Sequence, residues 1–309
     1  MGGGGGGGYI PPSSDAIKRK IEKARRDEQL RLDEDVNRFL QRELILYNDR
    51  DVEQTQARLD ELAKLLGDTM ELDNFLFGGS VAKHTYVDGL SDVDALVVLD
   101  RSDTRGISAE KVLNDFYKKL NESLPRQNVV SIDKGRLAVT IRYKDDSEVQ
   151  LLPAIRSGNL IKIPDSSGAG WNETNPRIFQ QQLARQNERL NGALVPTIKL
   201  VKSLISDLPK QQQLTGYHIE ALALDAAKGY RGPKTPRAML SHVLVHAATH
   251  SRTPISDISG QSRNVDDYLG KPDSAQRKLA SQAIAGIRRR LDAATSIAQW
   301  KAMFGRVEK

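Results

Sequence analysis

The sequence predicts an α+β protein in which a lobe built on a β-sheet is followed by an all-helical lobe. Short apolar runs that are typical of strands are confined to residues 74–163. From residue 176 onward apolar residues recur at helical spacing, and a long, highly charged helix is expected before the first strand. Strands and helices therefore separate along the chain instead of alternating, which is typical of the α+β class.

The composition is that of a folded protein with a mild excess of positive charge. Of the 309 residues, 39% are hydrophobic and 28% are charged, with 46 Lys and Arg against 40 Asp and Glu and an isoelectric point near 9.3. This balance suits polyanions such as nucleotides or nucleic acid, but it does not select among them, because both signs are mixed along most of the chain. Cysteine is absent, which excludes disulfides, cysteine-ligated zinc and thiol catalysis.

The N-terminal part of the chain is predicted to contain a flexible tail and two helices, and no membrane-targeting segment. No stretch reaches the roughly 18 apolar residues of a membrane span, and the first residues lack the features of a signal peptide, so we expect a cytoplasmic protein without membrane contact. Residues 1–13 contain seven consecutive glycines and are expected to form a flexible tail. Two helices are expected next, over residues 14–47 and 51–66, the second ending at Gly67.

The sheet is expected between residues 74 and 163. Residues 95–99 (ALVVL) form a continuous apolar run, which predicts a central strand, and a helix is expected over 108–124. We expect Pro153 to end the strand that begins at Glu148. The full set of expected strands, mostly antiparallel in its second half and with the last at an edge, is 74–77, 95–99, 129–132, 136–143, 148–152 and 160–163.

A polar, glycine-rich stretch after Pro164 is expected to connect the two lobes. The helices expected beyond it are 176–191, 192–208, 215–229, 235–250 and 273–303. The intervening residues 253–272 are expected to form a long loop, and loops of that length inside a compact domain are usually functional.

Two acidic residues stand one residue apart where the expected central strand begins. Asp92 and Asp94 point to the same face of a strand, and two carboxylates on one face repel unless a cation lies between them. Oxygen-only ligands of this kind suit Mg²⁺ or Mn²⁺, and two such ions are the usual device for in-line displacement at phosphorus. The pair therefore predicts a site for two divalent cations.

A Gly-Gly-Ser turn follows the first expected strand, twelve positions before the acidic pair. Gly79 lets the backbone approach a polyphosphate, the Ser80 hydroxyl and exposed N–H groups bind its oxygens, and Lys83 adds positive charge. Neither motif is specific by itself, because ordinary turns and caps use both. Their combination, followed by a buried strand, is far more specific and predicts a polyphosphate-binding site.

The segment GGSVAKHTYVDGLSDVDALVVL (78–99) resembles the core of the polymerase-β-like nucleotidyltransferases, and more narrowly that of the bacterial cGAS/DncV-like enzymes (CD-NTases) and the oligoadenylate synthases. The likeness extends over about residues 10–300. The long first helix resembles the spine helix of that family, GWNETNP (170–176) its linker between lobes, and YHIEALAL (217–224) a later helix. The resemblance implies the polymerase-β-like fold, with a mixed-sheet catalytic lobe and spine helix over 14–165 and a helical lobe over 166–309.

The resemblance also implies further site residues. IKLVKSL (198–204) resembles the helix whose lysine meets the triphosphate, which points to Lys202, or to Lys199 one turn away. EVQLLPAI (148–155) resembles the strand of the third metal-binding Asp, but Gln150 stands in that position, and its amide oxygen binds a cation without adding charge. In one alternative Glu148 completes the metal site directly or through water; in the other the site is weak and the protein is slow or inactive.

The histidines and one tryptophan have less specific interpretations. His84 lies between the two motifs and is a candidate substrate contact, whereas His218 is interpreted as a packed residue. Trp171 is interpreted as an anchor of the connection between lobes. Histidines that recur every four residues on one helix face have a spacing that fits a metal, but the sequence shows no fourth ligand for them; they are His242, His246 and His250.

The resemblance implies a template-independent nucleotidyltransferase that uses NTPs, ATP among them, to make a cyclic di- or trinucleotide. Such a product is a second messenger of bacterial anti-phage (CBASS) signalling and activates a separate effector, and a regulatory protein is a further implied partner. Two alternatives stay open. One is an enzyme that extends an RNA or tRNA 3′ end, and the other is a nucleotide-binding pseudo-enzyme, for which Gln150 is the main indication.

Overall fold

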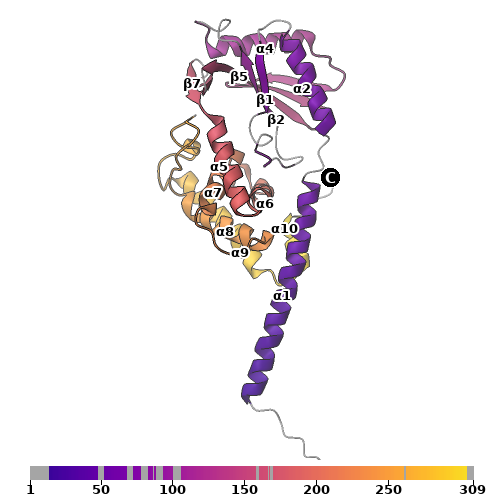
Figure 1. The fold of residues 1–309 in the computed structure, drawn as a ribbon, viewed down its shortest axis with the longest axis vertical. Coiled ribbons are helices and arrows are strands. Elements are labelled where there is room, and N and C mark those ends of the chain that lie inside the picture. The colour runs from indigo at the N-terminus through magenta and orange to yellow at the C-terminus, as the bar shows by residue number, and fades with distance from the viewer. Residues whose placement is uncertain are drawn as a thin grey trace, which may run out of the picture.

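The structure is a computed structural model that describes residues 14–47, 52–67, 72–77, 83–85, 87, 93–99, 106–157, 160–165, 167, 170–260 and 262–304. These residues form a lobe with a β-sheet and a second, helical lobe below it (Figure 1). The predicted α+β class is confirmed, because the strands gather in the first lobe and the chain from residue 176 to residue 304 is mainly helical.

The sheet is mixed, with one parallel strand pair at its centre. Its strands run in the order β1-β2-β5-β4-β3, and β6 pairs with both β5 and β7. The pair β2–β5 is parallel, and the other named pairs are antiparallel. The strands are β1 (Leu72–Phe77), β2 (Val93–Leu99), β3 (Val129–Lys134), β4 (Val139–Tyr143), β5 (Glu148–Ser157), β6 (Leu160–Pro164) and β7 (Trp171–Thr174). The central position predicted for residues 95–99 is confirmed.

One face of this sheet is covered by α2 (Val52–Gly67) and α4 (Ala109–Ser123). In α4 the Ser108 side chain caps the first turn by accepting a hydrogen bond from the backbone N–H of Lys111. The buried residues of α4 recur at helical spacing and pack with buried leucines of α2 and with alternate residues of the strands. The other face of the sheet carries a smaller apolar cluster around Val98, Ala154 and Ile163, with Asp94 on the same face of β2.

Two strand predictions are corrected by the pairing of the sheet. Residue Pro153 does not end β5, which continues to Ser157. Pairing of β5 with β4 stops at Leu151 and its pairing with β6 starts at Ile155, so the missing N–H of proline falls in a gap between two partners. The strand over 160–163 is not an edge among the described strands, because it pairs with β7, which lies in the predicted connecting stretch.

The helical lobe has its own apolar core. Most residues of α6 and α7 are buried in it. The single helix predicted over 273–303 is two helices, because Ser296 starts a new one: Gln299 Oε1 accepts the backbone N–H groups of Thr295 and Ser296. The helices are α5 (Pro176–Arg189), α6 (Leu194–Ser206), α7 (Gly216–Ala227), α8 (Pro236–His250), α9 (Ala275–Ala293) and α10 (Ile297–Phe304), with short 3₁₀ turns over Lys210–Gln212 and Asp267–Leu269.

The long first helix, α1 (Ser14–Leu46), packs with the helical lobe, although we grouped it with the sheet lobe in the segment 14–165. Its C-terminal half contacts α6, α8 and α10 through buried Val36, Phe39 and Leu40. At its end the Tyr47 hydroxyl donates to Ser203 Oγ over 2.8 Å. Its N-terminal half extends beyond the body of the molecule (Figure 1). Among the described residues, no helix combines the length and the apolar content needed to cross a membrane.

Candidate active site

The sheet face opposite α2 and α4 carries Asp94 beside Gln150. Parallel pairing of β2 with β5 sets these two residues opposite each other, and Thr140 of β4 is the next partner of Gln150. Paired residues on neighbouring strands point to the same face. The neighbours Val149 and Leu151 are buried in the apolar core, so Gln150 and Asp94 face away from it. An aspartate and an amide oxygen are thus side by side, which is a donor set that fits a hard divalent cation.

Glu148, the alternative ligand, has a different partner. Its Oε1 forms an ion pair with Arg142 Nε, and Arg142 Nη1 also lies 2.7 Å from Asp133 Oδ2. Since Arg142 already neutralises this carboxylate, Gln150 is the better placed of the two candidates beside Asp94. The residues Gly79, Ser80 and Asp92 lie outside the described part of the chain, and their roles stay predictions.

Two of the predicted lysines meet at a single carboxylate that the sequence analysis missed. Lys202 Nζ of α6 is 2.8 Å from Glu220 Oε1 of α7, and Lys83 Nζ forms an ion pair with Glu220 Oε2. Glu220 is 1% exposed, and the lysines are 7% and 12% exposed. A lone acid inside the apolar run IEALAL was a usable signal, because a buried carboxylate requires a cationic partner.

The segment between the two sequence motifs docks on the helical lobe at this point. Lys202 Nζ donates to the carbonyl oxygen of Thr85 over 3.0 Å, and the Thr85 hydroxyl donates to Glu220 Oε1. Val87, two residues further on, is buried in the core of the helical lobe. Residues 83–85 and 87, which lie between the two motifs in the sequence, are therefore held against the helical lobe.

Electrostatic coupling joins the sheet acid to the helical lysine. Burial lowers the pKa of Lys202, while Glu220 and Asp94 raise it and Lys83 lowers it further. Asp94 therefore lies close enough to act on Lys202. Burial and the charge of Lys202 lower the pKa of Lys199, which is 8% exposed. For Glu220, burial alone would raise the pKa, but the attraction of Lys83 and Lys202 outweighs it and lowers that pKa.

Aromatic rings and the long loop complete this side of the site. Lys83 Nζ lies 5.0 Å from the ring centroid of Tyr217 and 5.2 Å from that of Phe179. The Tyr217 hydroxyl donates to Asp257 Oδ1 over 2.7 Å, and Asp257 belongs to the loop predicted over 253–272. Because that loop holds the Tyr217 ring that lies over Lys83, it reaches the candidate site.

The remaining predicted residues have ordinary surroundings. Trp171 Nε1 donates to the carbonyl oxygen of Ile107 over 3.1 Å, which confirms its interpretation as an anchor. His218 is fully buried, and its Nδ1 lies 3.0 Å from the Tyr268 hydroxyl, which confirms the packed interpretation. His84 is exposed and has a φ of 57°, and no described contact tests its role toward substrate.

Comparison with known proteins gives one family match and several similar folds. The model of the Second Messenger Oligonucleotide or Dinucleotide Synthetase domain matches residues 30–187. A curated relative, phosphoribosylformylglycinamidine cyclo-ligase of Lactococcus lactis, is 30% identical over 151 residues, which are 46% of this chain. Those residues are 43% of the relative, so the chain spans less than half of that protein and its name is not carried over.

Three solved structures illustrate the similarity of fold. CdnC of Escherichia coli MS115-1, in a complex with HORMA-deltaN, is 16% identical with a TM-score of 0.61, over 82% of this chain and 91% of that chain. CdnG of Bradyrhizobium diazoefficiens, in complex with GTP, is 17% identical with a TM-score of 0.61, over 83% and 90%. The di-nucleotide cyclase DncV of Vibrio cholerae, in complex with ATP and GTP, is 10% identical with a TM-score of 0.60, over 95% and 92%.

Proposed function

This chain belongs to the second messenger oligonucleotide or dinucleotide synthetase family, and from that premise we propose that it is a template-independent nucleotidyltransferase. Its substrates are NTPs, ATP among them, and its product is a cyclic di- or trinucleotide that acts as a second messenger in bacterial anti-phage signalling. The product activates a separate effector. A regulatory protein is a further partner, as in the complex of CdnC with HORMA-deltaN.

The observation that carries this proposal is the arrangement of charge around Glu220. Two buried ammonium groups, on Lys83 and Lys202, share one carboxylate, and Asp94 of the sheet acts electrostatically on Lys202. Two ammonium groups that converge on one carboxylate and are largely shielded from water form a cationic site that favours a further anion. A triphosphate is such an anion, and the Gly-Gly-Ser turn leads directly into the segment that carries Lys83 and Thr85.

Each residue then has a defined part in the transfer. Gly79 and Ser80 bind the triphosphate, Lys83, Lys199 and Lys202 neutralise it, and Glu220 holds two of those lysines in place. A ribose hydroxyl of a second nucleotide loses its proton and forms a bond to the α-phosphorus, while the bond from that phosphorus to the bridging oxygen breaks and pyrophosphate leaves. Repetition on the joined nucleotides closes the ring.

Divalent ions fit the donors beside Asp94. Asp92 and Asp94 would hold two Mg²⁺ or Mn²⁺ ions, with Gln150 contributing an amide oxygen, since Gln150 is paired with Asp94 across β2 and β5. Such ions, when bound, lower the pKa of the attacking hydroxyl and neutralise the leaving pyrophosphate. Because Gln150 adds no charge, we expect weaker metal binding than with a third carboxylate.

The test is to incubate the purified chain with α-labelled NTPs and Mg²⁺ or Mn²⁺ and then to treat the products with phosphatase. A labelled compound that resists phosphatase is expected for the unchanged chain, and Asp94→Ala should lower its formation at least about a thousandfold while the circular dichroism spectrum is unchanged. Label that is transferred to added RNA instead would contradict a cyclic product.

A pseudo-enzyme is the second candidate, and the neutral Gln150 is the observation that favours it. That function predicts no incorporation of label with either metal, although NTPs would still bind at Lys83 and Lys202. Binding and turnover therefore have to be measured on the same sample, with Asp94→Ala as the reference for zero turnover.

A further inference from the structure

Two histidines and an aspartate form a cluster between α7 and α8. Asp225 lies near the end of α7, and His246 and His250 lie in the last turns of α8. Each of them offers one potential ligand atom, and these atoms all lie within 4.8 Å of one another. We propose that the three residues bind a borderline divalent cation, Zn²⁺ foremost. This inference is independent of the proposed nucleotidyltransferase function.

The ring of His250 is oriented as in known metal sites. Its Nδ1 lies 3.0 Å from the carbonyl oxygen of His246, and because a carbonyl only accepts, Nδ1 must carry the proton. The lone pair is therefore left on Nε2, the nitrogen available to a metal. Metal-binding histidines usually donate their other ring N–H to a carbonyl or carboxylate in this way.

The other two ligands are also held. His246 Nε2 lies 2.9 Å from Asp225 Oδ2, and Lys228 Nζ lies 2.9 Å from Asp225 Oδ1. The rings of His246 and His250 are stacked, with centroids 3.7 Å apart and an angle of 12° between the planes. The second carboxylate oxygen is thus directed at the histidine pair while the first stays on the lysine.

The distances need only small side-chain adjustments. Zn–N and Zn–O bonds of about 2.0–2.1 Å in a tetrahedral site place ligand atoms roughly 3.3 Å apart. His246 Nε2 and Asp225 Oδ2 are 2.9 Å apart, just below that value. The potential ligand atoms of all three residues lie within 4.8 Å of one another, so the remaining separations exceed it by at most about 1.5 Å. Two histidines four residues apart on one helix are a common zinc-binding pair, and water can fill the fourth position.

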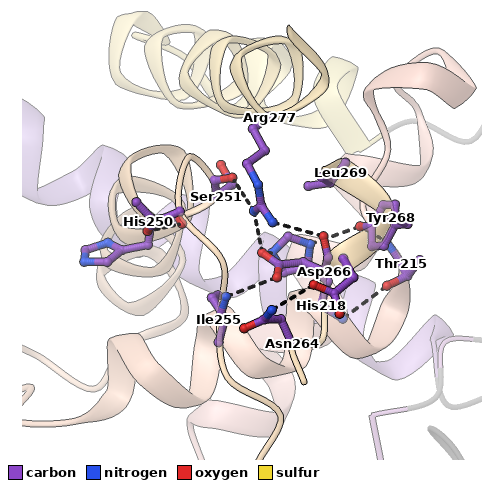
Figure 2. Close-up of polar contacts among 12 residues, drawn as sticks. Thr215, His218, His250, Ser251, Ile255, Asn264, Asp266, Tyr268, Leu269 and Arg277 are labelled. Atoms are coloured by element: carbon purple, nitrogen blue, oxygen red, sulfur yellow. Dashed lines mark hydrogen bonds and ion pairs between the residues drawn. The ribbon is translucent and has the colours of Figure 1, made fainter. Parts of the chain in front are cut away.

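The structure also separates this cluster from neighbouring groups. His242, the third member of the histidine repeat, has Nε2 2.8 Å from the carbonyl oxygen of Ala226 and packs on Tyr230, so it is not a ligand. Figure 2 shows the His250 ring pointing away from Arg277 and Asp266, and His250 is exposed, so an ion can enter. The ligand that the sequence did not show is Asp225, which comes from the neighbouring helix.

Metal binding at His246 requires an unprotonated ring nitrogen. Burial and the neighbouring His250 lower the pKa of His246, with His242 acting in the same direction and Asp225 opposing them. Because a carboxylate oxygen accepts, the Nε2–H of His246 donates to Asp225 Oδ2 in the metal-free chain. Binding of Zn²⁺ at Nε2 requires that nitrogen's lone pair, so the proton moves to Nδ1. A bound ion would join α7, which carries Glu220, to α8.

The proposal is tested by isothermal titration of ZnCl₂ into the full chain after chelation, with millimolar Mg²⁺ present to occupy the carboxylate site. The unchanged chain and the matched control His242→Ala should each bind one Zn²⁺. His250→Ala and Asp225→Asn should weaken that binding at least about tenfold. The exposed position of His250 makes it the variant that is safest for folding.

Thermal unfolding provides a second measurement on the same samples. Zn²⁺ should raise the midpoint of the unchanged chain and of His242→Ala, because it binds the folded state, and it should not raise the midpoint of His250→Ala. The proposal is overturned if the unchanged chain does not bind one Zn²⁺. It is also overturned if His242→Ala weakens Zn²⁺ binding as much as His250→Ala does. Binding that disappears in Asp94→Asn but persists in His250→Ala would also overturn it.

Discussion

Two buried charge networks in this protein are built differently. At the junction of the lobes, Lys83 and Lys202 share the single carboxylate of Glu220. Inside the helical lobe, Arg277 meets Asp266 one to one, and both side chains are fully buried (Figure 2). The charged side chains of both networks are largely or fully shielded from solvent. Burial alone therefore does not distinguish a structural ion pair from a binding site.

The arginine network provides partners for the Arg277 guanidinium and for both carboxylate oxygens of Asp266. Arg277 Nη1 lies 2.6 Å from Asp266 Oδ2, and its other donors reach the carbonyl oxygens of Ser251, Gly270 and Asp266. The second oxygen of Asp266 accepts the backbone N–H of Ile255. The network ties the loop of residues 253–272 to α9. Its two opposite charges neutralise each other without a ligand.

The lysine network has more positive than negative charge at its carboxylate. The second acid near these lysines is Asp94 of the sheet, which acts on Lys202 and which we expect to bind metal ions during catalysis. The difference between the two networks is therefore the number of cations at one carboxylate, and on the proposed function this number, more than the depth of burial, marks the site of an anionic ligand.

The largest expected effect is on the balanced network. Arg277→Met should lower the free energy of unfolding by about 3–5 kcal/mol, because it leaves Asp266 as a buried charge without its partner. Urea unfolding at neutral pH measures it. Arg289→Met, an exposed arginine on the same helix, is the control and should change stability by less than about 0.5 kcal/mol. Equal losses in the two variants would contradict the structural role of Arg277.

The next effect separates the two networks by their response to nucleotide. Glu220→Gln removes the shared carboxylate and should cost about 3 kcal/mol, since two buried lysines lose their counter-charge. Added NTP with Mg²⁺ should restore part of this loss, so its shift of the thermal midpoint should exceed that of the unchanged chain. Asp266→Asn is the matched control, and NTP should not rescue it. A nucleotide response equal in both variants would remove the distinction between the networks.

A smaller effect depends on pH. Burial lowers the pKa of His218 to about 4, Asp266 opposes that shift and Arg277 adds to it. The unfolded chain, with a histidine pKa near 6.5, binds more protons between pH 6.5 and 4, so stability is present above pH 6.5 and falls as the pH drops. The loss from this group is at most about 3 kcal/mol.

The measurement is urea unfolding at pH 7 and pH 4.5 of the unchanged chain and of His218→Gln. Carboxylates that titrate in the same range contribute to both proteins, so the difference between them gives the contribution of His218. The pH slope should be smaller in the variant. An unchanged slope would mean that His218 does not carry the linkage.

The smallest expected effect concerns the metal ligands. Gln150→Asp adds a carboxylate next to Asp94 and should lower the Mg²⁺ concentration needed for half-maximal product formation several-fold, by about 1 kcal/mol of binding. Glu148→Gln is the control, because Arg142 already neutralises that residue and its loss should leave the Mg²⁺ dependence unchanged. A Gln150→Asp variant that needs more Mg²⁺ would contradict the placement of Gln150 in the metal site.

Local sequence patterns predicted most of the elements, because a buried strand and an amphipathic helix each leave a period in the chain. The failures share one cause. Pro153 stays inside β5 because its two neighbours leave a gap at that position, and α1 packs on the helical lobe because its apolar stripe meets α8 and α10. A local pattern shows that a surface is apolar, but not which partner covers it.

For the candidate site too, some features were predictable from the sequence and others only from the structure. By itself the sequence determined the residue types and spacing of the Gly-Gly-Ser and Asp-x-Asp motifs, because both motifs are local, and the lysines of α6 were predicted from the family resemblance. Only the tertiary structure decided that Glu220 holds Lys83 to Lys202, that Gln150 stands beside Asp94, and that Asp225 meets His246. Those pairs join residues from different elements, and which charges meet across elements depends on how helices and strands pack.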